Sequence, residues 1–154
     1  MKRTPAAVAL LLLASAPAHA QSLCGVWKLV EVAITGGPDA GRHTTDVQPG
    51  LLLFTNAYYA GMQVRGFEPR PQLSATPTDE ERGRVFTPFT ANAGTYVLRD
   101  SALMVTPLVA KNPASMRGGS STDRVRVVAD TLWIISASGD RQNKWLRIER
   151  TCGP

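Results

Sequence analysis

Apolar and polar residues alternate with a period of two along most of the chain, which is the pattern of half-buried β-strands. The alternating stretches are "GVWKLVEVAI" at 25–34, "GLLLFTNAYYAGMQVRG" at 50–66, "AGTYVLRDSALMVTPLVA" at 93–110 and "STDRVRVVADTLWIISASGDRQNKWLRIERT" at 121–151. Turn-forming residues divide these stretches at Asn56-Ala57, Arg99-Asp100-Ser101, Ala129-Asp130 and Ser138-Gly139-Asp140. The pattern predicts an antiparallel meander of about eight strands.

A long connection at 68–92 is the place where a helix is predicted. Its start is rich in proline, but Thr78 and Glu81 have the spacing of a capping box. We therefore expect one short helix between the third and fourth strands. The apolar residues Val85, Phe86 and Phe89 follow at roughly helical spacing, so one face of this helix is expected to be buried.

The first twenty residues have the features of a cleaved secretory signal. A basic start, a short apolar run and a small-x-small site follow one another: Lys2 and Arg3, residues 6–14, and Ala18-His19-Ala20. The apolar run is too short to span a bilayer as a helix. Bulky Leu23 argues against a lipid anchor on Cys24, and a retained N-terminal anchor is the remaining alternative. We expect a signal peptide at 1–20, cleavage after Ala20, a domain at 21–154 in the periplasm or medium, and no stable membrane anchor.

Charge and histidine content narrow the function classes. The net charge of +5 falls to +3 once Lys2 and Arg3 are removed, and the other basic residues are scattered. Binding to nucleic acid or to an anionic membrane is therefore not expected. His43 is the single histidine after residue 20. We expect no metal site, no cofactor and no catalytic residues, because neither a ligand cluster nor a nucleophile–histidine arrangement is present in the sequence.

The two cysteines, Cys24 and Cys152, lie next to the two ends of the predicted meander. An even pair in an exported domain favours a disulfide, with two free buried thiols as the alternative. Closing an even-numbered up-and-down sheet removes its exposed edges and brings the start of the first strand beside the end of the last. Cysteine positions and strand count together predict an all-β fold: a closed, antiparallel, up-and-down, eight-stranded barrel with a disulfide at its seam.

The order of several short motifs resembles the bacterial and fungal lipocalin-like domain family. The matching stretches are "CGVWKLVEV", with its G-x-W-x-L opening, "LLLFTNAYYAGMQV", "TDEE", "TANAGTYVL" and "WLRIERT". The resemblance covers most of residues 23–151. It implies a lipocalin-type barrel in which Trp27 packs across the closed end under an arginine of the last strand. We expect that arginine to be Arg150, with Arg147 as the alternative.

Alternation also predicts which side chains face the interior. The inward set is Trp27, Leu29, Leu52, Phe54, Tyr58, Met62, Val64, Tyr96, Leu98, Met104, Leu132, Ile134, Leu146 and Ile148. A cavity near the open mouth is expected to bind a ligand through Tyr58, Tyr59, Met62, Tyr96 and Met104. Tyrosine combines an apolar body with a polar tip, and methionine adapts to irregular shapes. The Gly- and Pro-rich loop at 35–49 is expected to lie over this mouth as a lid.

Three functions are compatible with such a barrel. The favoured one is a monomeric barrel that binds a small hydrophobic or amphipathic molecule. The first alternative is a protein–protein interaction or inhibitor module that uses the barrel as a scaffold. The second is an isomerase or cyclase, which predicts a polar group of perturbed pKa inside the barrel.

Overall fold

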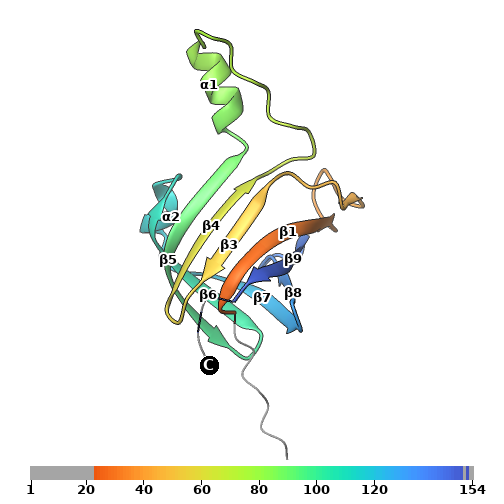
Figure 1. Cartoon of the computed structure of the whole chain (residues 1–154), viewed down its shortest axis with the longest axis vertical. Helices are drawn as coiled ribbons and strands as arrows, with labels where there is room; N and C mark the ends of the chain where they lie inside the picture. Colours follow the sequence, from red (N-terminus) through yellow and green to blue (C-terminus); the bar gives the residue numbers. More distant parts are fainter. Residues whose placement is uncertain (1–22, 151, 153–154) are drawn as a thin grey trace, which may run out of the picture.

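The structure, a computed structural model, describes residues 23–150 and 152, so the predicted signal peptide at 1–20 lies outside the described residues. The elements in chain order are β1 (Gly25–Ile34), β2 (His43–Thr44), β3 (Gly50–Phe54), β4 (Tyr58–Val64), α1 (Asp79–Phe86), β5 (Phe89–Arg99), β6 (Ala102–Ala110), α2 (Ala114–Arg117), β7 (Ser121–Val128), β8 (Thr131–Ile135) and β9 (Arg141–Glu149). Figure 1 shows their arrangement.

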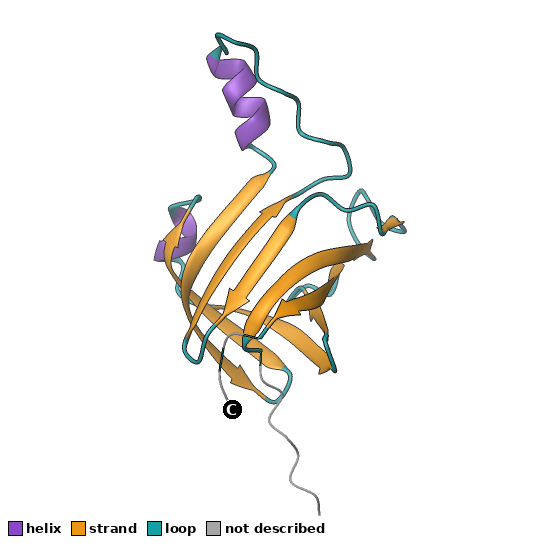
Figure 2. Cartoon of the chain, viewed as in Figure 1, coloured by secondary structure: helices purple, strands orange, loops and turns teal. Residues whose placement is uncertain are grey.

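The strands form one antiparallel sheet that closes on itself (Figures 1 and 2). The pairing order is β1-β3-β4-β5-β6-β7-β8-β9, and β1 also pairs with β9. Each long strand therefore has two neighbours, and no long edge is left exposed. The predicted closed, up-and-down barrel of eight strands is confirmed.

The short strand β2 lies outside the barrel ring and pairs with the far end of β1. Val32 lies opposite Thr44, and Ala33 lies opposite His43. Two residues are too few to give a periodic pattern, which is why the sequence predicted only a loop at 35–49. The same loop contributes Val47 to the packing against the core.

The position of the helix differs from the prediction. Helix α1 follows β4 and precedes β5, because β2 adds a strand before it in the chain order. A second helix, the single turn α2, lies in the connection between β6 and β7 and was not predicted. Its cap residue, Pro113, makes no side-chain hydrogen bond, and the Asn112 side chain accepts from the backbone N–H of Ala114 at 3.1 Å instead, a signal that the prediction passed over.

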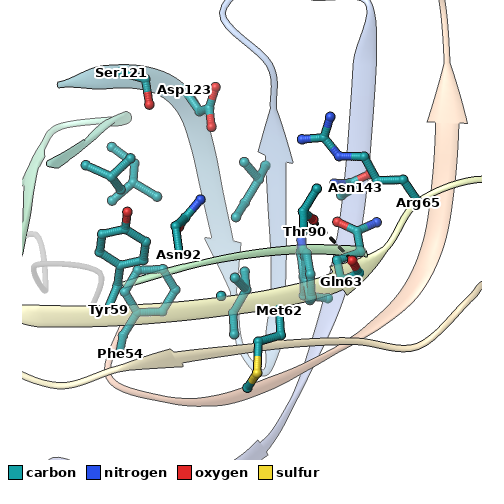
Figure 3. Close-up of a pocket in the computed structure, with 16 residues that line it drawn as sticks. Phe54, Tyr59, Met62, Gln63, Arg65, Thr90, Asn92, Ser121, Asp123 and Asn143 are labelled. Carbon is teal, nitrogen blue, oxygen red and sulfur yellow. Dashed lines mark hydrogen bonds between the residues drawn. The ribbon is translucent and has the colours of Figure 1, made fainter. Parts of the chain in front are cut away.

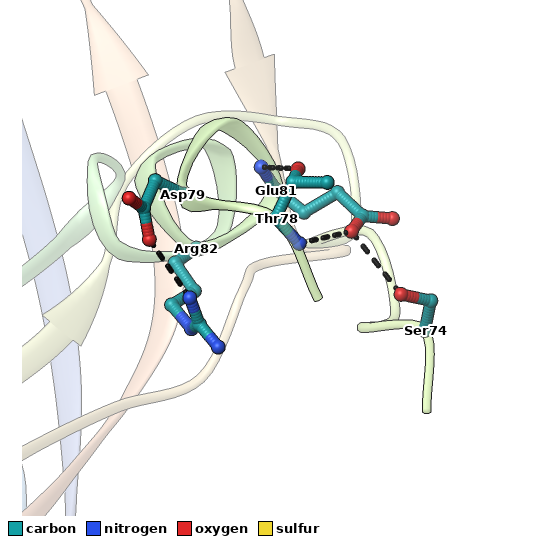
Figure 4. A network of polar contacts seen from close by, with 5 residues as sticks. All are labelled: Ser74, Thr78, Asp79, Glu81 and Arg82. Carbon is teal, nitrogen blue, oxygen red and sulfur yellow. Dashed lines mark hydrogen bonds and ion pairs between the residues drawn. The ribbon is translucent and has the colours of Figure 1, made fainter. Parts of the chain in front are cut away.

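The predicted capping box at the start of α1 is confirmed (Figure 4). The backbone N–H of Glu81 donates to Thr78 Oγ1 at 3.2 Å, and the backbone N–H of Thr78 donates to Glu81 Oε2 at 2.8 Å. Ser74 Oγ donates to the same carboxylate at 3.1 Å. These donors, the Thr78 N–H above all, hold the pKa of Glu81 below its ordinary value.

Helix α1 stands away from the sheet, beyond the ends of β4 and β5 (Figure 1). It has no buried residue, and Phe86 is 57% exposed, so the predicted buried face is wrong. Phe89 instead begins β5. Lys111 ties the end of the helix to the barrel, because its ammonium donates to the carbonyls of Phe86, Thr87 and Phe89. This polar contact replaces the expected apolar one.

The seam between β1 and β9 is closed by the predicted disulfide. Cys24 and Cys152 are bonded, with their Cα atoms 5.5 Å apart. Gly25 follows with φ of +139°, and a Cβ atom there would lie 2.5 Å from the carbonyl oxygen of Glu149. A residue without a side chain is therefore required for the two strands to meet at this point.

Trp27 and Arg147 lie directly opposite each other at the closed end of the barrel. The Trp27 side chain is fully buried, and its Nε1 donates to the carbonyl of Leu23 at 2.7 Å. The guanidinium carbon of Arg147 lies 4.3 Å from the centre of the Trp27 ring, and its Nη1 donates to the carbonyl of Cys24 at 3.0 Å. The arginine thus covers the ring and also caps a backbone group at the seam.

The prediction that Arg150 covers Trp27 is wrong, and the alternative, Arg147, is correct. Arg150 ion-pairs with exposed Asp130 at 2.7 Å. The register shifts because Ile148 is an extra residue in β9, a β-bulge between the pairs on either side of it. Counting back from Cys152 opposite Cys24 places Arg150 opposite Val26, whereas in the structure Val26 lies opposite Glu149 and Trp27 lies opposite Arg147.

The interior set is partly as predicted. Its buried core comprises Leu23, Trp27, Leu29, Val32, Ile34, Phe54, Tyr59, Leu103, Val125, Val127, Leu132 and Trp145. A second bulge, at Val30, moves the inward phase of β1 from Leu29 to Val32. Alternation alone does not reveal such a shift.

Five predicted inward residues lie on the outer face instead. Tyr58, Met62, Leu146 and Ile148 are 57%, 43%, 45% and 56% exposed, and Met104 pairs with outward-facing Val97. In β4 and β9 two large apolar residues are adjacent, so either could have faced inward. Tyr59 is the inward residue of β4, because it lies opposite buried Phe54. Trp145 is the inward residue of β9, because it lies opposite buried Leu29 and Leu132.

Candidate ligand-binding site

A cavity of about 270 Å³ lies within the barrel, toward the end away from the disulfide. Its apolar lining comes from Leu52, Phe54, Leu103, Val105, Ile134 and the rings of Tyr59 and Trp145. Its polar lining comes from Gln63, Arg65, Thr90, Asn92, Ser121, Asp123 and Asn143. Figure 3 shows Asn92 and Asp123 pointing into this space from β5 and β7. Apolar and polar side chains of the lining lie side by side on neighbouring strands: Leu103 pairs with Asp123, and Ile134 pairs with Asn143.

The lack of a side chain at Gly61 provides part of the space that the cavity occupies. It faces inward on β4, opposite Leu52 of β3 and Asn92 of β5. A Cβ atom at Gly61 would lie 2.8 Å from a methyl carbon of Leu52. The layer of side chains around the barrel is thus interrupted at one position, which opens room beside the Asn92 amide.

Three polar atoms of the lining are buried and have no hydrogen-bond partner among the described residues: Tyr59 Oη, Asn143 Oδ1 and Trp145 Nε1. Buried polar atoms are almost always paired in folded proteins, with water or ligand where protein groups are absent. An indole N–H can only donate, whereas an amide oxygen can only accept. A group that pairs with these atoms must therefore offer an acceptor to Trp145 and a donor to Asn143.

Asp123 places a carboxyl group in the same cavity. Burial raises its pKa above the ordinary aspartate value, and a hydrogen bond from the backbone N–H of Ala137 opposes this shift in part. Burial likewise raises the pKa of Tyr59. Both groups therefore favour their neutral, proton-donating forms more than exposed groups do.

Two of the five predicted ligand-binding residues border this cavity. Tyr59 lines it with a side chain that is 6% exposed. Met62 is also at its border, but its side chain points to the opposite side of its strand from Tyr59 and Asn92 (Figure 3). Tyr59 is therefore the one predicted residue whose ring faces the cavity.

The other three predicted residues lie elsewhere. Tyr96 faces inward but lies nearer the closed end, where its hydroxyl donates to the carbonyl of Thr55 at 2.7 Å. Tyr58 and Met104 lie on the outer face of the barrel and are absent from the cavity lining. The expectation of a cavity lined by tyrosine and methionine is replaced by one lined with amides and a carboxyl group.

The sequence contained a signal for the residues that were missed. Asp123 has the same period-two phase as buried Val125 and Val127, and Asn143 has the same phase as buried Trp145. A polar residue in the inward phase of a barrel strand marks a polar interior site. The prediction weighed apolar residues only and so passed over them.

The topology and the closed end together define the kind of barrel. Up-and-down antiparallel barrels of eight strands are the architecture of lipocalins. Here β1 carries the buried Trp27, and β9 supplies the arginine that covers it. The fold is a lipocalin-like barrel.

No protein-family model matches the sequence, and no curated protein is significantly similar to it. Among solved structures, a lipocalin-like protein from Bacteroides uniformis is similar with a TM-score of 0.49 and 13% identity, over 82% of this chain and 98% of that one. An uncharacterized protein from Bacteroides eggerthii is similar with a TM-score of 0.49 and 10% identity, over 82% of this chain and 99% of that one. Neither structure informs on a ligand of this lipocalin-like barrel.

Residues 23–150 and 152 contain no group of three or more His, Cys, Asp or Glu side chains placed to hold a metal ion. No helix in this part of the chain has the length and apolar character needed to cross a membrane.

Proposed function

We propose that this lipocalin-like barrel binds a small amphipathic molecule in the cavity at its open end. The cavity volume, about 270 Å³, is close to the lower end of the range of about 300–1,000 Å³ that is typical of ligand pockets. A ligand of this size would lay its apolar part against Phe54, Leu103 and Ile134. Its polar part would face Asn92 and the other polar side chains of the lining.

The observation that carries this assignment is the set of unpaired buried atoms on Tyr59, Asn143 and Trp145. A lining of this kind is unsuited to a purely hydrocarbon ligand, because the three atoms would remain without partners at a cost of about 1–3 kcal/mol each. The apolar side chains of the lining are equally unsuited to a fully hydrated ion. An amphipathic molecule with one donor and one acceptor satisfies both parts.

Native mass spectrometry of the protein purified from its own cells tests this function. We expect a bound small molecule that dissociates on unfolding. The variant Asn92→Phe, which fills the cavity from β5, should lose it. Thr95→Phe adds the same ring to the outer face of the same strand and should keep it. Wild-type protein that carries only water, and that binds no compound from an extract of the same cells, would contradict the assignment.

Acid–base chemistry on a bound molecule is the second candidate, and Asp123 is the observation that favours it. A partly buried carboxyl group of raised pKa inside a cavity is a candidate general acid or base. Asp123→Asn discriminates between the two functions. An enzyme would bind its substrate but lose turnover, whereas a binding protein would show no turnover in either form.

We also propose that the chain is exported and that residues 1–20 are removed. The signal-like sequence supports this, and the Cys24–Cys152 disulfide is compatible with an oxidising compartment. The intact mass of the protein recovered from the periplasm or medium tests it. The expected chain begins at Gln21, and a mass that includes residues 1–20 would contradict the proposal.

A further inference from the structure

Two arginines stand at the mouth of the barrel without a carboxylate to pair with. Arg65 directly follows β4 and lines the cavity. Arg141 begins β9 and lines a small adjoining pocket. Gln63 lines both spaces, and the charge of Arg65 acts on Arg141, so the two arginines lie near each other. Among the described residues, neither guanidinium forms an ion pair.

The nearby acids do not neutralise this pair. Asp39 ion-pairs with Arg42 at 3.2 Å. Asp140 accepts hydrogen bonds from Ser136 at 2.7 Å and from Ser138 at 2.6 Å. Both charges act on Arg141, but neither acid forms an ion pair with it among the described residues. Its guanidinium is therefore open to hydrogen bonding with a group outside the chain.

The environment of Arg141 is unfavourable to its own charge. Burial lowers its pKa most, and the neighbouring charge of Arg65 lowers it further. A partly buried cation beside a second cation is relieved by an anion placed between them. Guanidinium groups bind carboxylates through paired, charge-assisted hydrogen bonds, so an oxyanion of this type fits the opening.

We infer that Arg65 and Arg141 bind the carboxylate of an amphipathic organic acid whose apolar part occupies the barrel cavity. This inference rests on the proposed ligand-binding function and names the class of ligand. The carboxylate belongs at the arginine side of the mouth, because the two guanidinium groups there can donate charge-assisted hydrogen bonds to it. The apolar part then packs against Phe54 and Leu103.

Calorimetric titration with three probes of equal chain length tests the inference: octanoate, octanol and octylamine. The protein is used with its disulfide intact at neutral pH. Two charge-assisted contacts should make octanoate bind at least about tenfold more tightly than octanol, and octylamine should bind more weakly than either. In the double variant Arg65→Gln with Arg141→Gln, the preference for octanoate over octanol should disappear while octanol binding stays the same.

Arg124→Gln is the matched control, because it removes one positive charge from the exposed face of β7. It should leave the preference for octanoate unchanged. Equal binding of octanoate and octanol to the wild type would overturn the arginine site and leave the ligand cavity standing. Failure of all three probes to bind would overturn the cavity as a ligand site, and the arginine site with it.

Discussion

The guanidinium carbon of Arg147 lies 4.3 Å from the centre of the Trp27 ring, at the point where the last strand of the barrel meets the first. The arginine side chain is only 7% exposed, and burial lowers its pKa more than its neighbour Arg150 does. A cation held in this way stabilises the closed end through the ring beneath it and through its hydrogen bond to the Cys24 carbonyl. The contact joins the two ends of the folded chain.

Arg147→Gln should lower the free energy of unfolding by about 1–3 kcal/mol, because it removes a buried cation–π contact and a charge-assisted hydrogen bond. Arg150→Gln removes an exposed ion pair with Asp130 and should cost less than about 1 kcal/mol. Urea denaturation of the two variants measures both values. Equal losses of unfolding free energy in the two variants would show that the contact of Arg147 with Trp27 adds no more stability than an exposed ion pair.

Replacing both Cys24 and Cys152 with alanine should lower the free energy of unfolding by about 2–5 kcal/mol. The disulfide closes a loop with a sequence separation of 128 residues, so it removes much conformational entropy from the unfolded chain. Urea denaturation of the oxidised wild type and the double variant measures the effect. As a check on the starting material, thiol titration of the unfolded, unreduced wild type should find no free thiol. Two reactive thiols would contradict the closed seam.

Asp123→Asn should raise the free energy of unfolding, relative to the wild type, by more at neutral pH than in acid. The folded-state pKa of Asp123 is raised, so the folded state holds this proton more tightly than the unfolded state. The contribution of Asp123 to wild-type stability therefore falls as the pH rises from about 3.8, the ordinary pKa, through the folded-state pKa. Asparagine removes this loss and can still accept the hydrogen bond from Ala137.

Urea denaturation near pH 3 and pH 7 measures the difference between Asp123→Asn and wild type at each pH. The same substitution at Asp46, an exposed residue in the loop before β3, is the matched control. A stability difference that is equal at the two pH values would contradict the burial of the Asp123 carboxyl group.

Much of the fold follows from two features of the sequence. Period-two alternation located the eight barrel strands, and the positions of Cys24 and Cys152 predicted which strands close the sheet. The capping box at Thr78 and Glu81 likewise predicted where α1 begins. Each is a local signal that depends on a few neighbouring residues, so it can be recognised without knowledge of the tertiary structure.

The errors arose where tertiary contacts decide between two local choices. The bulges at Val30 and Ile148 each change the inward phase of a strand, and neither carries a glycine or proline that would mark it. Tyr58 and Tyr59 are equivalent by composition, and the pairing with Phe54 selects the second. The site was missed for a further reason: its polar residues were judged as surface residues although they share the phase of the core.

The indole N–H resonances of the protein test the ligand cavity most directly. Trp145 lines the cavity, and its Nε1 has no partner among the described residues. Trp27 Nε1 is bonded to the Leu23 carbonyl at the closed end, and Trp133 packs under Arg126 on the outer face. These two tryptophans are internal controls for any general effect of added ligand.

The measurement is a two-dimensional ¹H–¹⁵N NMR titration of the wild type with octanoate, in which Trp145→Phe assigns the indole resonance of interest. Binding in the cavity should shift the Trp145 indole resonance in a saturable way and leave those of Trp27 and Trp133 in place. A Trp145 resonance that does not move, or three resonances that move together, would contradict the cavity as the ligand site.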